Sequence, residues 1–289
     1  MTVALPRSAC LMPRSVAEQV AETARTALLA ELYTWPKPGL VSHVDTGSHT
    51  DMDVHRLDAS AASITPFFAL LALAGAAGSG MEALRDIGQA AEREMLQVTN
   101  GVNTHRGAIF GMGLLCAAAG ATWSGASRQV WRAARLAETV RRRWGPSIQR
   151  GPIPLRSHGT DALRRFGAGG ARAQAAAGFP HALEVGLPAF RMGRILAPGD
   201  LEAARVQGFF ALLATMEDTN LLHRGGAEGL RFAQESAAYF LECGGVAKAG
   251  WRDRAAAVHR DFVARRLSPG GCADLLAITL FLDALESLE

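Results

Sequence analysis

The sequence predicts an all-α protein, and three observations point to that class. Apolar residues recur every three to four positions along most of the chain, which is the period of an amphipathic helix. Strict alternation of apolar and polar residues, the mark of a half-buried strand, is almost absent. Alanine and leucine far outnumber the β-branched residues outside short patches. We therefore expect one compact all-α domain of roughly nine to eleven helices over residues 15–289, preceded by a flexible segment at residues 1–14.

In the first half of the domain, helix-start signals and periodicity agree. One capping box, Ser15-x-x-Glu18, opens the first segment, and a second, Ser79-x-x-Glu82, opens another. The most apolar run, residues 64–78, falls short of the roughly 20 residues that cross a bilayer, so we expect a buried core helix there. Helices are predicted at residues 15–33, 64–78, 79–98, 103–119 and 127–144.

The helical pattern resumes after two looser zones. Residues 145–158 hold three prolines and residues 166–178 hold several glycines among alanines, so both are interpreted as loops of the same domain. Asp200 stands where it can cap a helix, and Ser268-Pro269 offers a cap and a first-turn proline for the last helix. Helices are predicted at residues 201–216, 226–243, 248–267 and 269–288.

Composition and charge narrow the class of protein. Hydrophobic residues make up 49% of the chain and charged residues 20%, which is typical of a globular protein. The net charge is +3 and no long basic block occurs, so neither a nucleic-acid nor a membrane surface is indicated. Four scattered cysteines give no disulfide framework, and the N-terminus lacks a continuous apolar leader. The sequence therefore predicts a soluble, cytoplasmic protein.

The densest polar segment places three histidines and four aspartates within residues 43–58. Just before it, Lys37 stands between two prolines, which disfavour helix and display the lysine on an extended turn. His49, Asp51 and Asp53 alternate, so in an extended segment they project to one side. Paired carboxylates suit Mg²⁺, and Zn²⁺ is a lesser option. The alternative is that Asp51 is only a loop residue and Asp53 only a helix cap.

A second polar segment, GVNTHRG at residues 101–107, precedes a helix rich in small residues. Asn103 is a candidate N-cap, which would place Arg106 in the first turn beside free backbone N–H groups, an arrangement that favours an anion. Gly107 allows another group to approach closely. The alternative is a capped helix that packs tightly against a neighbouring helix.

A third polar segment follows the helix predicted to end at Met216. It combines two acids, an amide, a histidine, an arginine and a glycine pair: Glu217, Asp218, Asn220, His223, Arg224, Gly225 and Gly226. A helix end with solvated charges explains the glycines, but not the acids and the carboxamide that precede an apolar pair.

Other segments give weaker signals. Ser157, His158 and Asp161 are triad residue types, yet they are too close in the chain and lack a G-x-S-x-G elbow. The Ser-Pro-Gly-Gly run at 268–271 could line a pocket or cap a helix, and Asp274 would stabilise a helix dipole. The chain has no Walker A motif or dinucleotide fingerprint.

Four segments together carry a family resemblance: PKPGLVSHVDTGSHTDMD, GVNTHRGAIFGMGLL, EDTNLLHRGG and LSPGGCADLLAITLFL. From about Val20 to the C-terminus, the chain resembles the triphosphoribosyl-dephospho-coenzyme A synthase family. That resemblance implies an all-α fold and the reaction of ATP with 3′-dephospho-CoA to give 2′-(5″-triphosphoribosyl)-3′-dephospho-CoA and adenine. Ser42-His43 follows PKPGLV, as in the malonate decarboxylase branch, whereas the citrate lyase branch usually has an aspartate there.

The resemblance also implies partners and ligands. ATP and dephospho-CoA are the expected substrates and Mg²⁺ the expected cofactor, with no nucleic acid and no membrane. The product is expected to pass to a carrier-protein transferase that serves the malonate decarboxylase acyl carrier protein. The sequence leaves open whether the chain forms a homodimer.

This chemistry gives the polar residues hypothetical roles in substrate binding. A triphosphate needs Mg²⁺ and fixed cations. We therefore expect Asp51 and Asp53 to hold the metal, and we expect Lys37, Arg106 and Arg224 to bind phosphates. The ribose hydroxyls and the rest of the substrate would contact Asn103, Asn220, Gly225 and Gly226.

Catalysis at C1′ of the ATP ribose needs further groups. A carboxylate near the oxocarbenium-like centre and a base for the attacking hydroxyl are expected, as in glycoside chemistry, and Glu217 or Asp218 would supply one of them. Proton transfer to adenine would be assisted by His49, His105 or His223.

Two other functions compete with this interpretation. A helical Mg²⁺-dependent hydrolase of a nucleotide or of ADP-ribose would use the same acids to direct water at C1′, and it would release free ribose triphosphate from ATP without dephospho-CoA. A non-catalytic scaffold for the carrier subunit would bind that subunit without consuming ATP. Dense polar clusters argue against the scaffold, which has no use for them.

Overall fold

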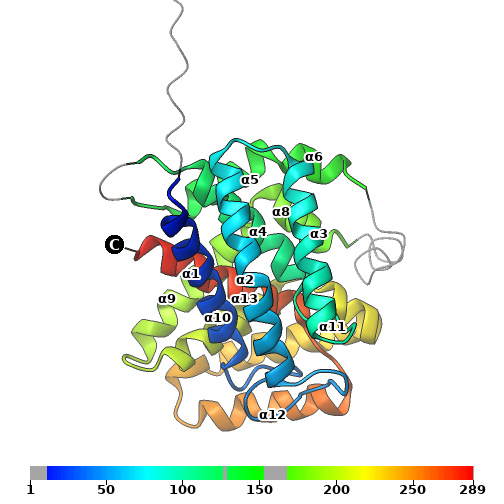
Figure 1. The fold of residues 1–289 in the computed structure, drawn as a ribbon. Coiled ribbons are helices and arrows are strands. Elements are labelled where there is room, and N and C mark those ends of the chain that lie inside the picture. The colour runs from blue at the N-terminus through cyan, green and yellow to red at the C-terminus, as the bar shows by residue number, and fades with distance from the viewer. Residues whose placement is uncertain (1–11, 126–128, 153–167, 289) are drawn as a thin grey trace, which may run out of the picture.

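The computed structural model describes residues 12–125, 129–152 and 168–288, and over these residues it is all-α, as predicted (Figure 1). It contains 12 α-helices in the described residues, 11 of them of seven or more residues, and no strand occurs there. The predicted flexible segment at 1–14 lies mostly outside the described residues and stays a prediction.

The first half of the chain forms a helical layer. Its helices are α1 (Arg14–Leu32), α2 (Val54–Ala76), α3 (Met81–Val98) and α4 (Arg106–Ala121). Two glycines bring α2 and α4 into backbone contact, since a Cβ on Gly75 would lie 1.8 Å from the Ala117 carbonyl oxygen. A Cβ on Gly120 would lie equally close to the carbonyl oxygen of Ala72. The small residues of this region therefore serve helix–helix packing.

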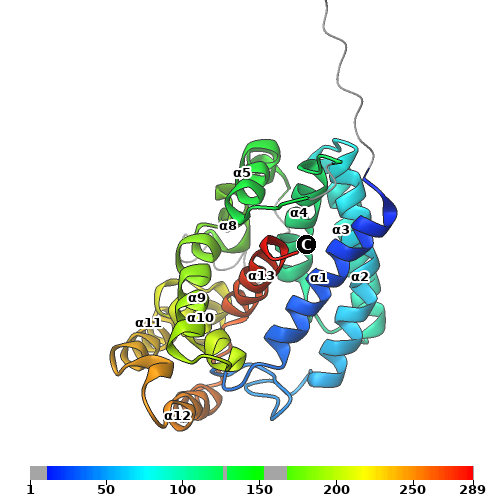
Figure 2. The same cartoon turned by 90° about the vertical axis from the view of Figure 1, so that its left-hand side faces the viewer.

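The second half forms the opposite side of the molecule. It comprises α5 (Ala133–Arg143), α6 (Gly145–Arg150), α8 (Gly170–Ala177), a π-helix (His181–Gly186), α9 (Leu187–Leu196), α10 (Leu201–Thr215), α11 (Thr219–Glu242), a 3₁₀ turn (Gly245–Ala247) and α12 (Trp251–Ala264). The last helix, α13 (Gly270–Glu286), lies between the two halves and packs against α1, α4 and α10 (Figure 2). Ten of its residues are buried, so it joins both sides through one core.

Most predicted helices are confirmed, with shifted boundaries. Asp200 caps α10 by accepting the Ala203 N–H, as expected. Both predicted capping boxes are wrong, because the caps of α1 and α3 are Pro13 and Gly80, and neither makes a side-chain cap bond. The zones 145–158 and 166–178, interpreted as loops, contain α6 and α8 in their described parts, and the π-helix and α9 follow where no helix was predicted.

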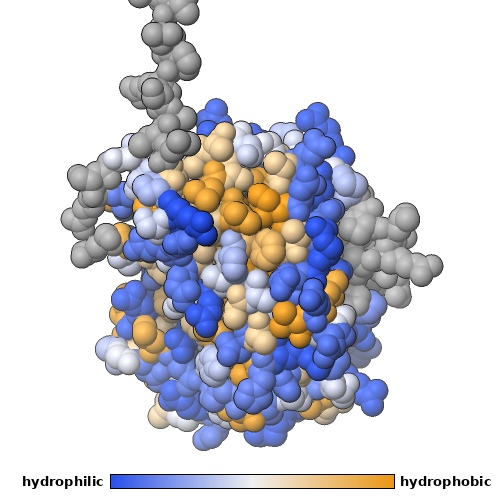
Figure 3. Space-filling model, in the orientation of Figure 1, coloured by the Kyte–Doolittle hydropathy of each residue, from blue (hydrophilic) through white to orange (hydrophobic). Residues whose placement is uncertain are grey.

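Helix α2 is the one described helix that is long and apolar enough to cross a membrane. It packs against α1, α3 and α4, which places it in the helical layer. Its outward face is also apolar: Leu70 is 48% exposed, and Figure 3 shows apolar side chains gathered over the region of α2.

Candidate functional site

A cavity of about 1200 Å³ lies between the two halves of the molecule. Its walls come from α1, the loop that follows it, α2, α3, α4, α6 and α8, and from the N-terminal parts of α11 and α13. All four family-like segments contribute to it, although they are far apart in the chain. The predicted site residues that line it are His49, Asp51, Asn103, His105, Arg106, Asn220, His223 and Arg224.

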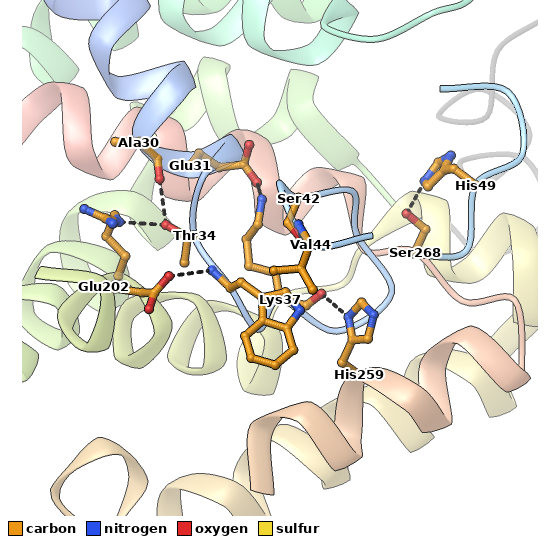
Figure 4. Close-up of polar contacts among 12 residues, drawn as sticks. Ala30, Glu31, Thr34, Lys37, Ser42, Val44, His49, Glu202, His259 and Ser268 are labelled. Carbon is orange, nitrogen blue, oxygen red and sulfur yellow. Dashed lines mark hydrogen bonds and ion pairs between the residues drawn. The ribbon is translucent and has the colours of Figure 1, made fainter. Parts of the chain in front are cut away.

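Side-chain bonds fasten the long loop between α1 and α2 to the C-terminal part of the chain. Ser48 Oγ donates to the Leu267 carbonyl at 2.6 Å, and His49 Nε2 lies 2.8 Å from Ser268 Oγ (Figure 4). The carbonyl of Lys37 accepts a hydrogen bond from His259 Nδ1 on α12 at 2.9 Å. These bonds bring the first polar segment next to the start of α13.

His49 is a neutral histidine at the cavity wall. Burial lowers its pKa, and the positive charge of Arg224 lowers it further. Nδ1 lies 3.3 Å from Asp51 Oδ1 and 3.5 Å from a guanidinium nitrogen of Arg224, and Nε2 lies 2.8 Å from Ser268 Oγ. Arg224 is anchored by the carbonyls of Ser48 and Arg266, at 3.3 and 3.1 Å.

His105 is also neutral, because it is buried and its pKa is lowered to about 4. Burial is the main cause, and the charge of Lys37 adds to it. Its Nδ1 lies 2.7 Å from Ser60 Oγ on α2. Below pH 6.5, the usual pKa of histidine, His105 is therefore protonated in the unfolded chain but stays neutral in the folded protein until the pH approaches about 4.

This difference makes folding stability depend on pH. Because the folded pKa is below the unfolded one, the contribution of His105 is fully present above pH 6.5 and is lost as the pH falls toward about 4. We expect a loss of up to about 3 kcal/mol over this range from His105 alone. Urea unfolding at several pH values should show that a His105→Gln variant lacks this part of the wild-type slope. Equal slopes for the two proteins would contradict the assignment.

Lys37, predicted to bind phosphate, is instead a buried partner of Glu31. Only 1% of its side chain is exposed, its Nζ bonds Glu31 Oε1, and it is not among the cavity-lining residues (Figure 4). Burial raises the pKa of Glu31 and lowers that of Lys37, while their mutual attraction opposes both shifts. Glu31 itself lines the cavity.

Asp218 is fully buried and joins the starts of two helices. Its carboxylate accepts the N–H groups of Asn220 at 2.8 Å, Leu221 at 3.2 Å and Cys272 at 2.9 Å. Asp218 is not among the residues that line the cavity, although its neighbour Asn220 is. Its bonds therefore place α11 and α13 side by side at the cavity wall. Glu217 is exposed and also lies outside the cavity lining.

Three further predicted residues lie outside the cavity lining. Asp53 caps α2 by accepting the Arg56 N–H at 2.8 Å, which is the alternative considered for it from the sequence. Gly226 has φ +61° and kinks α11, and Gly225 packs against Leu267. The weaker candidates Ser157, His158 and Asp161 lie outside the described residues.

The structure adds three acids that sequence reasoning did not place in the site, Glu31, Glu92 and Asp274. Burial raises the pKa of Asp274, and the charges of Glu31 and Asp218 raise it further. A Cβ on Gly107 would lie 1.9 Å from Asp274 Oδ2, so only a glycine there leaves room for this carboxylate. Asp274 stands within a family-like segment, which was the one available signal. No sequence signal indicated the close approach of Asp274 to Gly107.

The described residues contain no group of three or more His, Cys, Asp or Glu side chains that could hold a metal ion. A Mg²⁺ ion that arrives on a triphosphate needs fewer protein ligands, because it takes phosphate oxygens and waters as well. Asp51 suits this use, since it lines the cavity and 57% of its side chain is exposed. The donor set thus fits a substrate-borne Mg²⁺ better than a dedicated metal centre.

Comparisons with known proteins agree with the family-like segments. A family model described as ATP:dephospho-CoA triphosphoribosyl transferase matches residues 17–289. A probable 2-(5″-triphosphoribosyl)-3′-dephosphocoenzyme-A synthase of Stutzerimonas stutzeri (strain A1501) is 42% identical over 94% of this chain and 93% of its own length. The synthase of Klebsiella pneumoniae is 39% identical over 94% of this chain and 92% of its own length. No solved structure matches the chain.

Proposed function

The chain belongs to the ATP:dephospho-CoA triphosphoribosyl transferase family, and from this premise we propose what its cavity does. The cavity joins the triphosphoribosyl group of ATP to the 2′-hydroxyl of 3′-dephospho-CoA and releases adenine. One observation carries this proposal: residues from all four family-like segments line a single cavity of about 1200 Å³. That volume exceeds the usual range for one small ligand and suits two large substrates.

The arginine side chains that line the cavity would bind the phosphates. Arg224 is held by two backbone carbonyls, and Arg106 pairs with Glu92 at 3.0 Å, so both guanidinium groups are positioned before substrate arrives. Guanidinium groups bind phosphate oxygens in pairs of hydrogen bonds. Asp51 would hold Mg²⁺, which would neutralise triphosphate charge when bound.

The attacking hydroxyl needs a base, and His49 suits that task because it is neutral. With the proton on Nδ1, toward Asp51, Nε2 is the acceptor and bonds Ser268, which also lines the cavity. The 2′-hydroxyl would lose its proton to Nε2, directly or through Ser268 Oγ, as it attacks C1′ of the ATP ribose. The carboxylate of Glu31 provides negative charge near the ribosyl cation.

The cavity also has apolar lining residues on α3 and α4. Met81, Leu84 and Gly88 of α3 and Phe110 and Leu114 of α4 line it. Leu114 stands about 10 Å further along the axis of α4 than Gly107, at the 1.5 Å rise of a helix. The pantetheine chain of dephospho-CoA is long and largely apolar, so this part of the cavity would bind it, with Gln89 and Gln174 as amide partners.

A volume series at Gly88 tests this placement. Gly88 lines the cavity and a Cβ there meets nothing within 4 Å, so the backbone admits a side chain at this position, and replacing glycine favours the helix. We expect Gly88→Leu to raise KM for dephospho-CoA at least tenfold and to leave KM for ATP within twofold. Gly88→Ala, which has the same helical gain and little volume, is the matched control. If Gly88→Leu left both constants unchanged, the pantetheine chain would lie elsewhere.

Incubation of the protein with ATP, Mg²⁺ and dephospho-CoA tests the reaction itself. Mass spectrometry should find free adenine and the triphosphoribosyl adduct in equal amounts, and neither should form without dephospho-CoA. Ribose triphosphate formed from ATP alone would instead identify a hydrolase. Carrier binding without ATP consumption would identify a scaffold.

We further propose that the product serves the acyl carrier protein of malonate decarboxylase, after a carrier-protein transferase in the cytoplasm attaches it. Ser42-His43 supports this branch, because the citrate lyase branch usually has an acid at this position. Ser42 is buried, and its Oγ accepts the Val44 N–H at 3.1 Å, so it shapes the loop before His49.

A further inference from the structure

We propose that Asp274 is the catalytic acid that protonates the departing adenine. This assignment rests on the proposed function and names the proton donor of that reaction. A purine leaves C1′ readily only when a ring nitrogen gains a proton, so the site needs a donor close to the bound base.

The first argument is geometric. Asp274 lies near the N-terminal end of α13 at the cavity wall, and the absence of a side chain at Gly107 makes room for its carboxyl group. The Ala108 N–H donates to the carboxyl group, which fixes its orientation. Among the described residues, no cation forms an ion pair with Asp274, unlike Glu31 and Glu92, which also line the cavity.

The second argument is that the other candidates cannot supply the proton. His49 and His105 have lowered pKa values and are neutral, so neither is an imidazolium donor at pH 7. Lys37 is buried against Glu31 outside the cavity lining. Guanidinium groups do not release protons in this range. His223, exposed at the cavity, is the remaining competitor and enters the experiment.

The third argument is electrostatic. The negative charges of Glu31 on α1 and of Asp218 at the start of α11 act on Asp274, and Lys37 is ion-paired with Glu31. Burial and these two acids hold the pKa of Asp274 well above its usual range, which favours the protonated carboxyl. Glu31 keeps its ion pair with Lys37, so it would act as the charged stabiliser and Asp274 as the donor, a recurrent division of roles in catalysis at sugar carbons.

The proton balance closes with His49 as the base. The bond from C1′ to the adenine nitrogen breaks with its electron pair on adenine, and Asp274 gives its proton to a ring nitrogen. The bond from C1′ to the 2′-oxygen forms, and His49 takes the hydroxyl proton. After product release that proton returns to Asp274 through solvent. The sum is one proton moved from the 2′-hydroxyl to adenine.

The decisive experiment compares two leaving groups on the Asp274→Asn variant, in the presence of Mg²⁺ and dephospho-CoA. Adenine methylated at N7 leaves without a proton, so 7-methyl-ATP bypasses the acid. We expect kcat with ATP to fall at least about 100-fold, and kcat with 7-methyl-ATP to stay within threefold of wild type. In the pH–rate profile, the wild-type kcat with ATP should decline at high pH, as Asp274 loses its proton. The profile of the variant should lack this decline.

Controls separate this role from a structural one. Asp261→Asn, an exposed change on α12, should leave both substrates unaffected. Asp274→Asn should unfold no earlier than wild type, because it removes a carboxyl that burial disfavours. Equal loss with both substrates, or the 7-methyl-ATP rescue appearing in His223→Gln instead, would overturn the assignment. A wild-type protein that released no adenine from ATP would instead reject the proposed function.

Discussion

Replacing Lys37 with methionine is expected to lower the free energy of unfolding by about 3–5 kcal/mol, because Glu31 would be left as an unpaired buried charge. The lysine lies beneath the cavity wall, 1% exposed, and its carbonyl also anchors the loop to His259. Urea unfolding at pH 7 measures the loss. The double variant Glu31→Gln/Lys37→Met should recover much of it, since both charges are then gone.

The control for Lys37 is Lys248→Met, an exposed lysine at the start of the segment before α12, which should leave stability nearly unchanged. A stable Lys37→Met protein with a raised KM for ATP would contradict this interpretation. That result would restore Lys37 to the phosphate-binding role predicted from the sequence.

Asp218→Ala is the second large effect. The substitution leaves three buried N–H groups, of Asn220, Leu221 and Cys272, without their acceptor. Each unsatisfied buried group costs about 1–3 kcal/mol, so we expect a loss of at least about 3 kcal/mol. Because these bonds also join α11 to α13, activity should fall with stability.

Asp53→Ala is the matched cap variant, because Asp53 caps α2 through one N–H group and is exposed. A loss of about 1 kcal/mol is typical for such a cap. If Asp218→Ala cost no more than Asp53→Ala, the joining role of Asp218 would be wrong. Asp53→Ala has a second use: full activity would remove Asp53 as a metal ligand, and lost activity with a stable fold would support it.

The sequence was a good guide where local chemistry decides the outcome. The α1 and α10 segments follow the 3.6-residue period, and Asp200 caps α10 as its residue type predicts. Prediction failed over residues 145–158 and 166–178, which were interpreted as loops, the first because it holds three prolines. Pro146 and Pro188 instead lie in the first turns of α6 and α9, where a missing N–H costs nothing.

The candidate site was predictable as a set of segments, but less so residue by residue. Residue type indicates that Lys37 could bind phosphate and that Asp218 could act in catalysis. Only packing decides whether these side chains face the substrate or are bound by neighbouring protein groups. Conversely, Asp274 resembled an ordinary first-turn acid. Its setting depends on Gly107, Glu31 and Asp218, which lie far from it in the chain, so no local pattern could reveal it.

The central claim is that the four distant segments build one active cavity, and a crystal structure of Asp274→Asn with ATP, Mg²⁺ and dephospho-CoA tests it most directly. We predict the triphosphate against Arg106 or Arg224, adenine within hydrogen-bond distance of the residue 274 side chain, and the pantetheine chain beside Leu84 and Leu114. Nucleotides bound outside this cavity, or adenine remote from residue 274, would contradict the account.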